Sequence, residues 1–162
     1  MTATSSIPAG LEADSGAAFA WAIKKALQQT DDMLPVEVLA HDRAAGTVTV
    51  KHYITIVLTD GTQTTRPNEI EVPVITMGGG GFMMSFDLPV GSTGFIKALD
   101  RDWALFLQSY EESPPDTARF HSFSSGVFIP SVMQGWTIAE EDKAAMVIQS
   151  LDGTIKVSLS DD

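Results

Sequence analysis

The chain has 162 residues, of which 44% are hydrophobic, so it can form one domain with a substantial core. It contains no cysteine, which excludes disulfides and cysteine-based zinc sites. The formal net charge of −11 repels phosphate backbones and anionic lipid surfaces, so we expect no nucleic-acid partner. Residues 1–10 lack the basic and apolar regions of a signal peptide.

An N-terminal extension with one helix is expected over residues 1–31. Phe19, Ile23 and Leu27 recur at helical spacing within a helix predicted for 17–28. Trp21 lies off that apolar stripe. Trp21 and Phe19, with Trp136 further along the chain, mark a possible partner surface, although packing of Trp21 on the following domain is the simpler interpretation.

A mainly β fold is predicted from residue 34 onward, because the apolar period changes to two. His52 interrupts the apolar face of the first long strand signal, and a bulge or turn is expected near Lys51. Short strands with frequent turns and one interposed helix predict a small OB-like β-barrel over 32–135. The strand signals cover 47–59, 70–74, 82–88, 93–99 and 123–129, and the helix carries Trp103, Phe106 and Tyr110.

The C-terminal residues 136–162 show a different pattern. Strands are predicted at 144–151 and 154–159, with a turn at Asp152 and Gly153 between them. Ile155, Val157 and Leu159 share one strand face. Because an isolated hairpin is marginal in water, we expect other copies of the same chain to cover this face.

No arrangement of residues typical of catalysis or metal binding is found in the sequence. The histidines, His41, His52 and His121, have no metal-ligand spacing. We expect His52 to be a hydrogen-bonded core residue and His41 to lie in a solvated turn. The serines near His121 are expected to form a turn rather than a nucleophile with its base: Ser122, Ser124 and Ser125.

Two further patterns also have a structural explanation. The glycine run at 78–81 precedes a strand rather than a helix and has no lysine nearby, so a phosphate loop is disfavoured. The acidic pairs at 111–112 and 140–141 are typical of solvated surface. We therefore predict that the protein is not an enzyme and holds no cofactor.

Taken together, residues 71–133 resemble the N-terminal OB-fold domain family of phage membrane-piercing baseplate spikes. The resemblance rests on "EVPVITMGGGGFMMSFDLPVGSTGFIKALDRD" and on "ARFHSFSSGVFIPSV", whose landmarks follow in the family's order. Ser92 and Ser125 stand where the family often has acidic residues. The sequence reaches Asp162 without the H-x-H motif that holds iron in related spike tips, so a truncated spike or a separate tip protein is expected.

The resemblance implies a virion protein of the phage tail baseplate, made in the host cytoplasm: a central spike or hub-capping component that helps to puncture the host envelope. It implies a homotrimer whose residues 136–162 start a three-chain β-helical shaft. In such a shaft Ile155, Val157 and Leu159 would pack at the three-fold axis. The implied partners are tail hub and baseplate proteins, a possible separate tip protein and, transiently, the host outer membrane.

Two other functions remain open. A needle tip of a phage-derived contractile injection system would share the same architecture. A carbohydrate-binding OB-fold module would use exposed aromatic side chains for stacking, and its candidates are Tyr53, Trp103 and Trp136.

Overall fold

The computed structural model describes residues 15–28, 30–58, 61–66 and 69–160, and its chain divides into two compact units, Met1–Pro130 and Ser131–Asp162. Among these residues no helix is long and apolar enough to cross a membrane. The elements of the first unit are α1 (Ser15–Gln28), β1 (Met33–Asp42), β2 (Thr47–His52), β3 (Ile56–Val57), β4 (Gln63–Thr64), β5 (Ile70–Pro73), β6 (Met77–Gly79), β7 (Phe82–Met84), β8 (Thr93–Leu99), α2 (Ala104–Ser109) and β9 (Ser122–Pro130).

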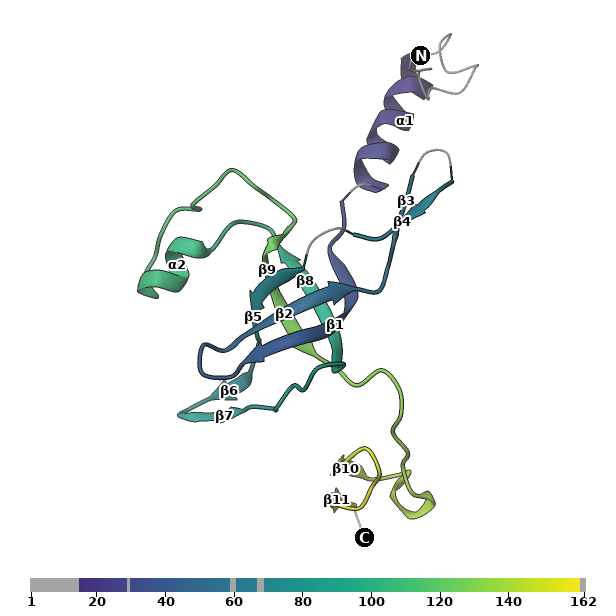
Figure 1. The fold of residues 1–162 in the computed structure, drawn as a ribbon, viewed down its shortest axis with the longest axis vertical. Helices are drawn as coiled ribbons and strands as arrows, with labels where there is room; N and C mark the ends of the chain where they lie inside the picture. The colour runs from purple at the N-terminus through teal and green to yellow at the C-terminus, as the bar shows by residue number, and fades with distance from the viewer. Residues whose placement is uncertain (1–14, 29, 59–60, 67–68, 161–162) are drawn as a thin grey trace. The chain divides into compact units, whose positions relative to one another are not determined.

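A five-stranded antiparallel sheet in the order β5-β2-β1-β8-β9 forms the main structure of the first unit. Its two end strands approach each other through a parallel bridge between Val74 and Phe128, where Ile75 donates its N–H to the carbonyl of Phe128 over 2.8 Å. The sheet therefore curls into a nearly closed barrel (Figure 1). The predicted mainly β, OB-like barrel with an N-terminal helix is confirmed.

The barrel core consists mostly of β-branched side chains from alternate strand positions, which is the packing that a pleated sheet favours. On β1 the buried residues are Val36 and Val38, and β2 contributes Val48 and Val50 at the same spacing. The remaining members of the buried cluster come from four other segments: Val72, Leu88, Ile96 and Phe128.

Gly94 on β8 makes room for the largest core side chain. A Cβ atom at this position would lie 2.4 Å from the ring of Phe128 and 2.6 Å from the carbonyl oxygen of Ile129. Glycine is therefore required here by close packing, not by a special backbone conformation.

The predicted strand 47–59 is interrupted after His52. Strand β2 ends there, and the pattern continues in the short β3, which pairs with β4 instead of the barrel. Ile54 and Leu58 are exposed, so the second half of the alternating pattern does not face the core. The break itself was expected; the extension of the core face to residue 58 was wrong.

The glycine run forms the tip of a separate hairpin made by β6 and β7. Gly79 pairs with Phe82, which leaves Gly80 and Gly81 as a two-residue loop, and both have positive φ, at 59° and 87°. Positive φ at both loop positions is typical of a type I′ hairpin turn, which glycine adopts without strain.

Candidate oligomerisation and partner-binding surfaces

A small antiparallel hairpin is the centre of the second unit. A one-turn 3-10 helix, η1 (Glu140–Asp142), precedes β10 (Met146–Gln149) and β11 (Lys156–Leu159). Asp152 organises the turn between the strands, because the Ser150 hydroxyl and both donors of Thr154 bond its carboxylate. These bonds, led by that of Ser150, lower the pKa of Asp152 to about 2.

One face of this hairpin is partly covered by polar contacts within the unit itself. Lys156 forms an ion pair with the buried carboxylate of Asp142 in η1, and its Nζ lies 3.4 Å from Glu141 Oε1. This charged hydrogen bond is the largest cause of a lowered pKa of Asp142 and of a raised pKa of Lys156. Gln149, opposite Lys156, donates to the backbone carbonyl of Thr137.

The other face of the hairpin is apolar and uncovered. Met146 lies opposite Leu159 and Ile148 opposite Val157, and directly opposite residues in an antiparallel pair share a face. Alternation places Ile155 on the same side, although it precedes the first residue of β11. All five side chains are between 57% and 76% exposed. The hairpin predicted at the C-terminus is present, and its apolar face includes two residues of β10 that the sequence analysis did not single out.

The predicted partner-surface aromatics differ in exposure. Phe19 of α1 is 69% exposed, as are large parts of Ile23 and Leu27 from the same stripe, whereas Trp21 is half-buried. Trp136, in the second unit, is 52% exposed. Phe19 and Trp136 are thus accessible to a partner, and Trp21 is partly covered.

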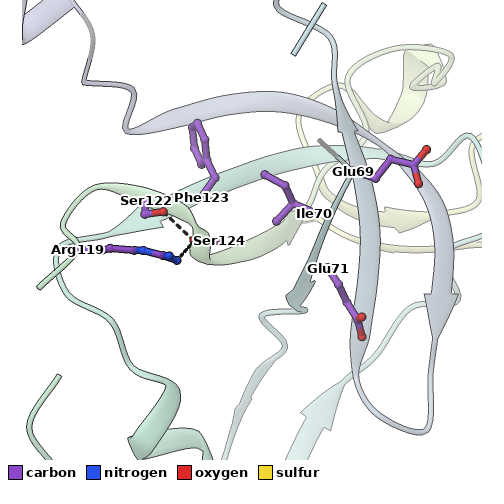
Figure 2. A pocket seen from close by; sticks show the side chains of 7 residues that line it. All are labelled: Glu69, Ile70, Glu71, Arg119, Ser122, Phe123 and Ser124. Carbon is purple, nitrogen blue, oxygen red and sulfur yellow. Dashed lines mark hydrogen bonds between the residues drawn. The ribbon is translucent and has the colours of Figure 1, made fainter. Parts of the chain in front are cut away.

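A cleft of about 900 Å³ lies in the first unit between the start of β5 and the start of β9 (Figure 2). Its lining residues are Glu69, Ile70, Glu71, Arg119, Ser122, Phe123 and Ser124. A neighbouring hollow of about 330 Å³ shares Glu71, Arg119 and Ser124 and adds Asp102, Trp103 and Asp116 at its border. Of the three predicted stacking aromatics, Trp103 lines this hollow, and neither Tyr53 nor Trp136 is among its described lining residues.

Hydrogen bonds fix several polar side chains around the cleft. The Ser122 and Ser124 hydroxyls bond each other over 2.8 Å, and Arg119 donates to Ser124 over 3.4 Å. Asp102 accepts from the N–H of Ala104 and from the Thr117 hydroxyl, and these bonds lower its pKa. The serines predicted to form a turn lie in strand β9 instead, because the strand begins at Ser122 and Ser125 is buried.

His52 is a core histidine, but the predicted hydrogen bonds are missing. Both of its ring nitrogens are buried, and neither has a hydrogen-bond partner among the residues that the structure describes. The ring packs against Phe123 with a centroid separation of 5.1 Å. Burial is the largest cause of the lowered pKa of His52, followed by the nearby charge of Arg66.

The other two histidines each contact a loop residue. His41 is half-buried rather than in a solvated turn, and its Nδ1 accepts the N–H of Leu88 over 3.2 Å. His121 lies 3.9 Å from Asp100. Within the described ranges, no group of three or more histidine and acidic side chains is placed to hold a metal ion.

The β6–β7 hairpin carries an exposed surface within the segment 82–88, which was predicted to be a strand of the barrel region. Phe82 is 84% exposed, and Met84 and Phe86 are also exposed, while Leu88 at the end of the same alternating set is buried. Met77 and Met83 extend this exposed apolar surface. The four consecutive glycines were the available signal for a hairpin at this point, because glycine adopts the positive φ of a two-residue turn without strain.

The barrel corresponds to a known protein family. A family model described as the N-terminal domain of the phage protein Gp138 matches residues 34–131, which run from the second residue of β1 to the first residue after β9. No curated protein matches the chain. Because the family match covers more than half of the 162 residues, the chain belongs to the Gp138 N-terminal domain family and is a phage structural protein.

Proposed function

We propose that the protein is the barrel and shaft base of a homotrimeric central spike in a phage tail baseplate, where it helps to puncture the host cell envelope. The observation that carries this proposal is the uncovered apolar face of the β10–β11 hairpin. Membership of a phage protein family supports a place in the virion, and the same architecture would serve in the needle tip of a phage-derived contractile injection system.

The composition of the hairpin faces supports self-association. On one face, Lys156 is held in an ion pair with Asp142 of η1. The opposite face presents five apolar side chains, and none of them is charged or capable of strong hydrogen bonding. Such a face binds another apolar surface, and identical copies supply one with matching strand spacing.

The energy available from this face suits a stable assembly. Full burial of one aliphatic side chain contributes about 1.5–3 kcal/mol. Five such side chains in each of three copies supply a gain of the same order as the entropic cost of association, estimated at about 4–15 kcal/mol for each binding step. In this arrangement Ile155, Val157 and Leu159 pack around a three-fold axis together with Met146 and Ile148.

The proposed role is mechanical rather than chemical. A spike transmits force through stiff, well-packed strands and requires no reacting side chain. The Phe19 and Trp136 surfaces are then contacts to tail hub and baseplate proteins or to a separate tip protein. The exposed β6–β7 hairpin is a further candidate for these contacts, because flexible methionine side chains adapt to varied surfaces.

Sedimentation equilibrium at micromolar chain concentration tests the trimer directly. We expect the mass of three chains for the unaltered protein and the mass of one for Val157→Glu, because a buried carboxylate at the axis is very costly. Leu151→Glu is the matched control: Leu151 is exposed but lies in the turn beyond β10, so this variant should remain trimeric. A monomeric unaltered protein, or equal effects of both variants, would refute the proposal.

A further inference from the structure

We propose that the cleft between β5 and β9 is a docking site for an extended segment of a partner protein with alternating basic and apolar residues, bound as an added strand. The cleft is lined by residues of the first unit, so this role is independent of the trimeric spike.

The two strands that border the cleft are joined by a single bridge. Among the described residues, their pairing consists of the contact between Val74 and Phe128. The cleft lies toward the other end of β5, where Figure 2 shows its lining side chains from residues 69–71 and 122–124. Strand edges of this kind are templates for pairing with another extended chain.

The hydrogen-bond pattern of β5 shows which peptide groups point into the cleft. Val74 donates its N–H to Gly46 on the β2 side, and Ile75 donates to Phe128 on the β9 side. Peptide groups alternate in direction along a strand, so Glu71 directs its N–H and carbonyl to the same side as Ile75. Pro73, on the same side, has no N–H and offers a carbonyl only. Glu71 is therefore the residue of β5 that provides both a donor and an acceptor to an added strand.

The side chains of the cleft match a peptide with two different faces. Ile70 and Phe123 are partly buried and pack against the barrel core, so they form an apolar floor. Glu69 and Glu71 are exposed at the border. Because side chains alternate along an extended peptide, every second residue would contact the floor and the others would reach the acidic border.

The acidic residues around the cleft favour a basic peptide as its occupant. The described residues that line the cleft and its neighbouring hollow include four acidic ones, Glu69, Glu71, Asp102 and Asp116, and one basic one, Arg119. A second copy of the chain cannot supply the alternating basic strand, because no two lysine or arginine residues stand two positions apart in its sequence. The occupant is therefore a different protein.

Fluorescence anisotropy with a labelled ten-residue peptide of alternating Val and Lys tests the site on the full chain. We expect saturable binding that weakens as salt is added. Glu71→Lys should weaken it about fivefold, and Glu69→Lys by a similar factor. Glu112→Lys is the control of equal charge change, in an exposed loop outside the cleft, and should bind normally. Circular dichroism confirms that each variant is folded.

Peptides with N-methyl groups separate strand addition from simple charge attraction. Methylation of the amides on one alternate set of residues should abolish binding, because those N–H groups face a strand edge, and methylation of the other set should not. Equal binding of both methylated peptides, or of an alternating Val and Glu peptide, would overturn the proposal. Displacement of the basic peptide by maltohexaose would assign the cleft to carbohydrate instead.

Discussion

The barrel and the C-terminal hairpin share a sequence pattern but differ in whether its apolar residues are buried. Both contain strands in which apolar residues alternate with polar ones. In the barrel, Val36, Val38 and Val50 are fully buried within one chain, whereas in the hairpin Val157 and Leu159 are exposed. The difference shows that alternation predicts an apolar strand face, but not whether the same chain covers it.

The amount of sheet available explains this difference. Five strands of the barrel curl until their inner faces enclose a common core. The hairpin has two strands and one short 3-10 helix, which is enough to cover one face. A two-stranded sheet needs additional packing for independent stability, which the proposed trimer would supply.

Truncation of a buried aromatic side chain should cause the largest change in the free energy of unfolding of the barrel. Phe128→Ala should lower the free energy of unfolding of the barrel by about 3–5 kcal/mol, because it leaves a large cavity in the core. Val157→Ala, measured in the same urea titration at nanomolar chain concentration, should change it by less than about 0.5 kcal/mol. A comparable loss in both variants would mean that the hairpin stabilises the barrel of its own chain.

A smaller loss is expected from overpacking the barrel. Gly94→Ala places a methyl group against the Phe128 ring and should cost about 1–3 kcal/mol of unfolding free energy in chemical denaturation. Gly79→Ala is the control, since its added Cβ would meet nothing within 4 Å. If the two alanine variants were equally stable, the close contact at Gly94 would not limit the packing of β8 against β9.

The smallest change in the free energy of unfolding is expected at His52, whose ring nitrogens lack hydrogen-bond partners among the described residues. His52→Leu should raise the free energy of unfolding by about 1 kcal/mol at pH 7.5, because it removes buried polar atoms that lack partners. The pKa of His52 is lower in the folded state than its ordinary value of 6.5, so the unfolded chain binds more protons and stability falls as the pH drops below about 6.5.

Thermal melts between pH 7.5 and 5 measure this dependence. The unaltered protein should lose stability over that interval, and His52→Leu should lose less. An identical pH profile for both proteins would show that protonation of His52 does not oppose folding.

Local sequence patterns predicted the barrel well. The strand at 93–99 was predicted with the bounds that the structure shows, since alternation and the flanking turn residues agree there. The predicted apolar stripe of α1 and the C-terminal hairpin are also present. Each of these predictions used one apolar period and the turn residues beside it, and none required knowledge of distant contacts.

Tertiary contacts decided the features that the sequence did not reveal. The exposed β6–β7 hairpin has the alternation of a core strand, and its position outside the barrel depends on the turn at Gly80 and Gly81. The cleft requires the separation of β5 from β9, which are distant in the chain. The missing partners of His52 likewise depend on which side chains surround it. Periodicity contains no information on such neighbours.

The uncovered hairpin face also constrains how a newly made copy survives before assembly. Its adhesive aliphatic side chains can attach to any unfolded polypeptide nearby, so productive encounters must outpace aggregation. The formal charge of −11 on every copy slows encounters between copies at low ionic strength. If the proposed trimer forms, electrolyte concentration would therefore set the pace at which sister chains find one another.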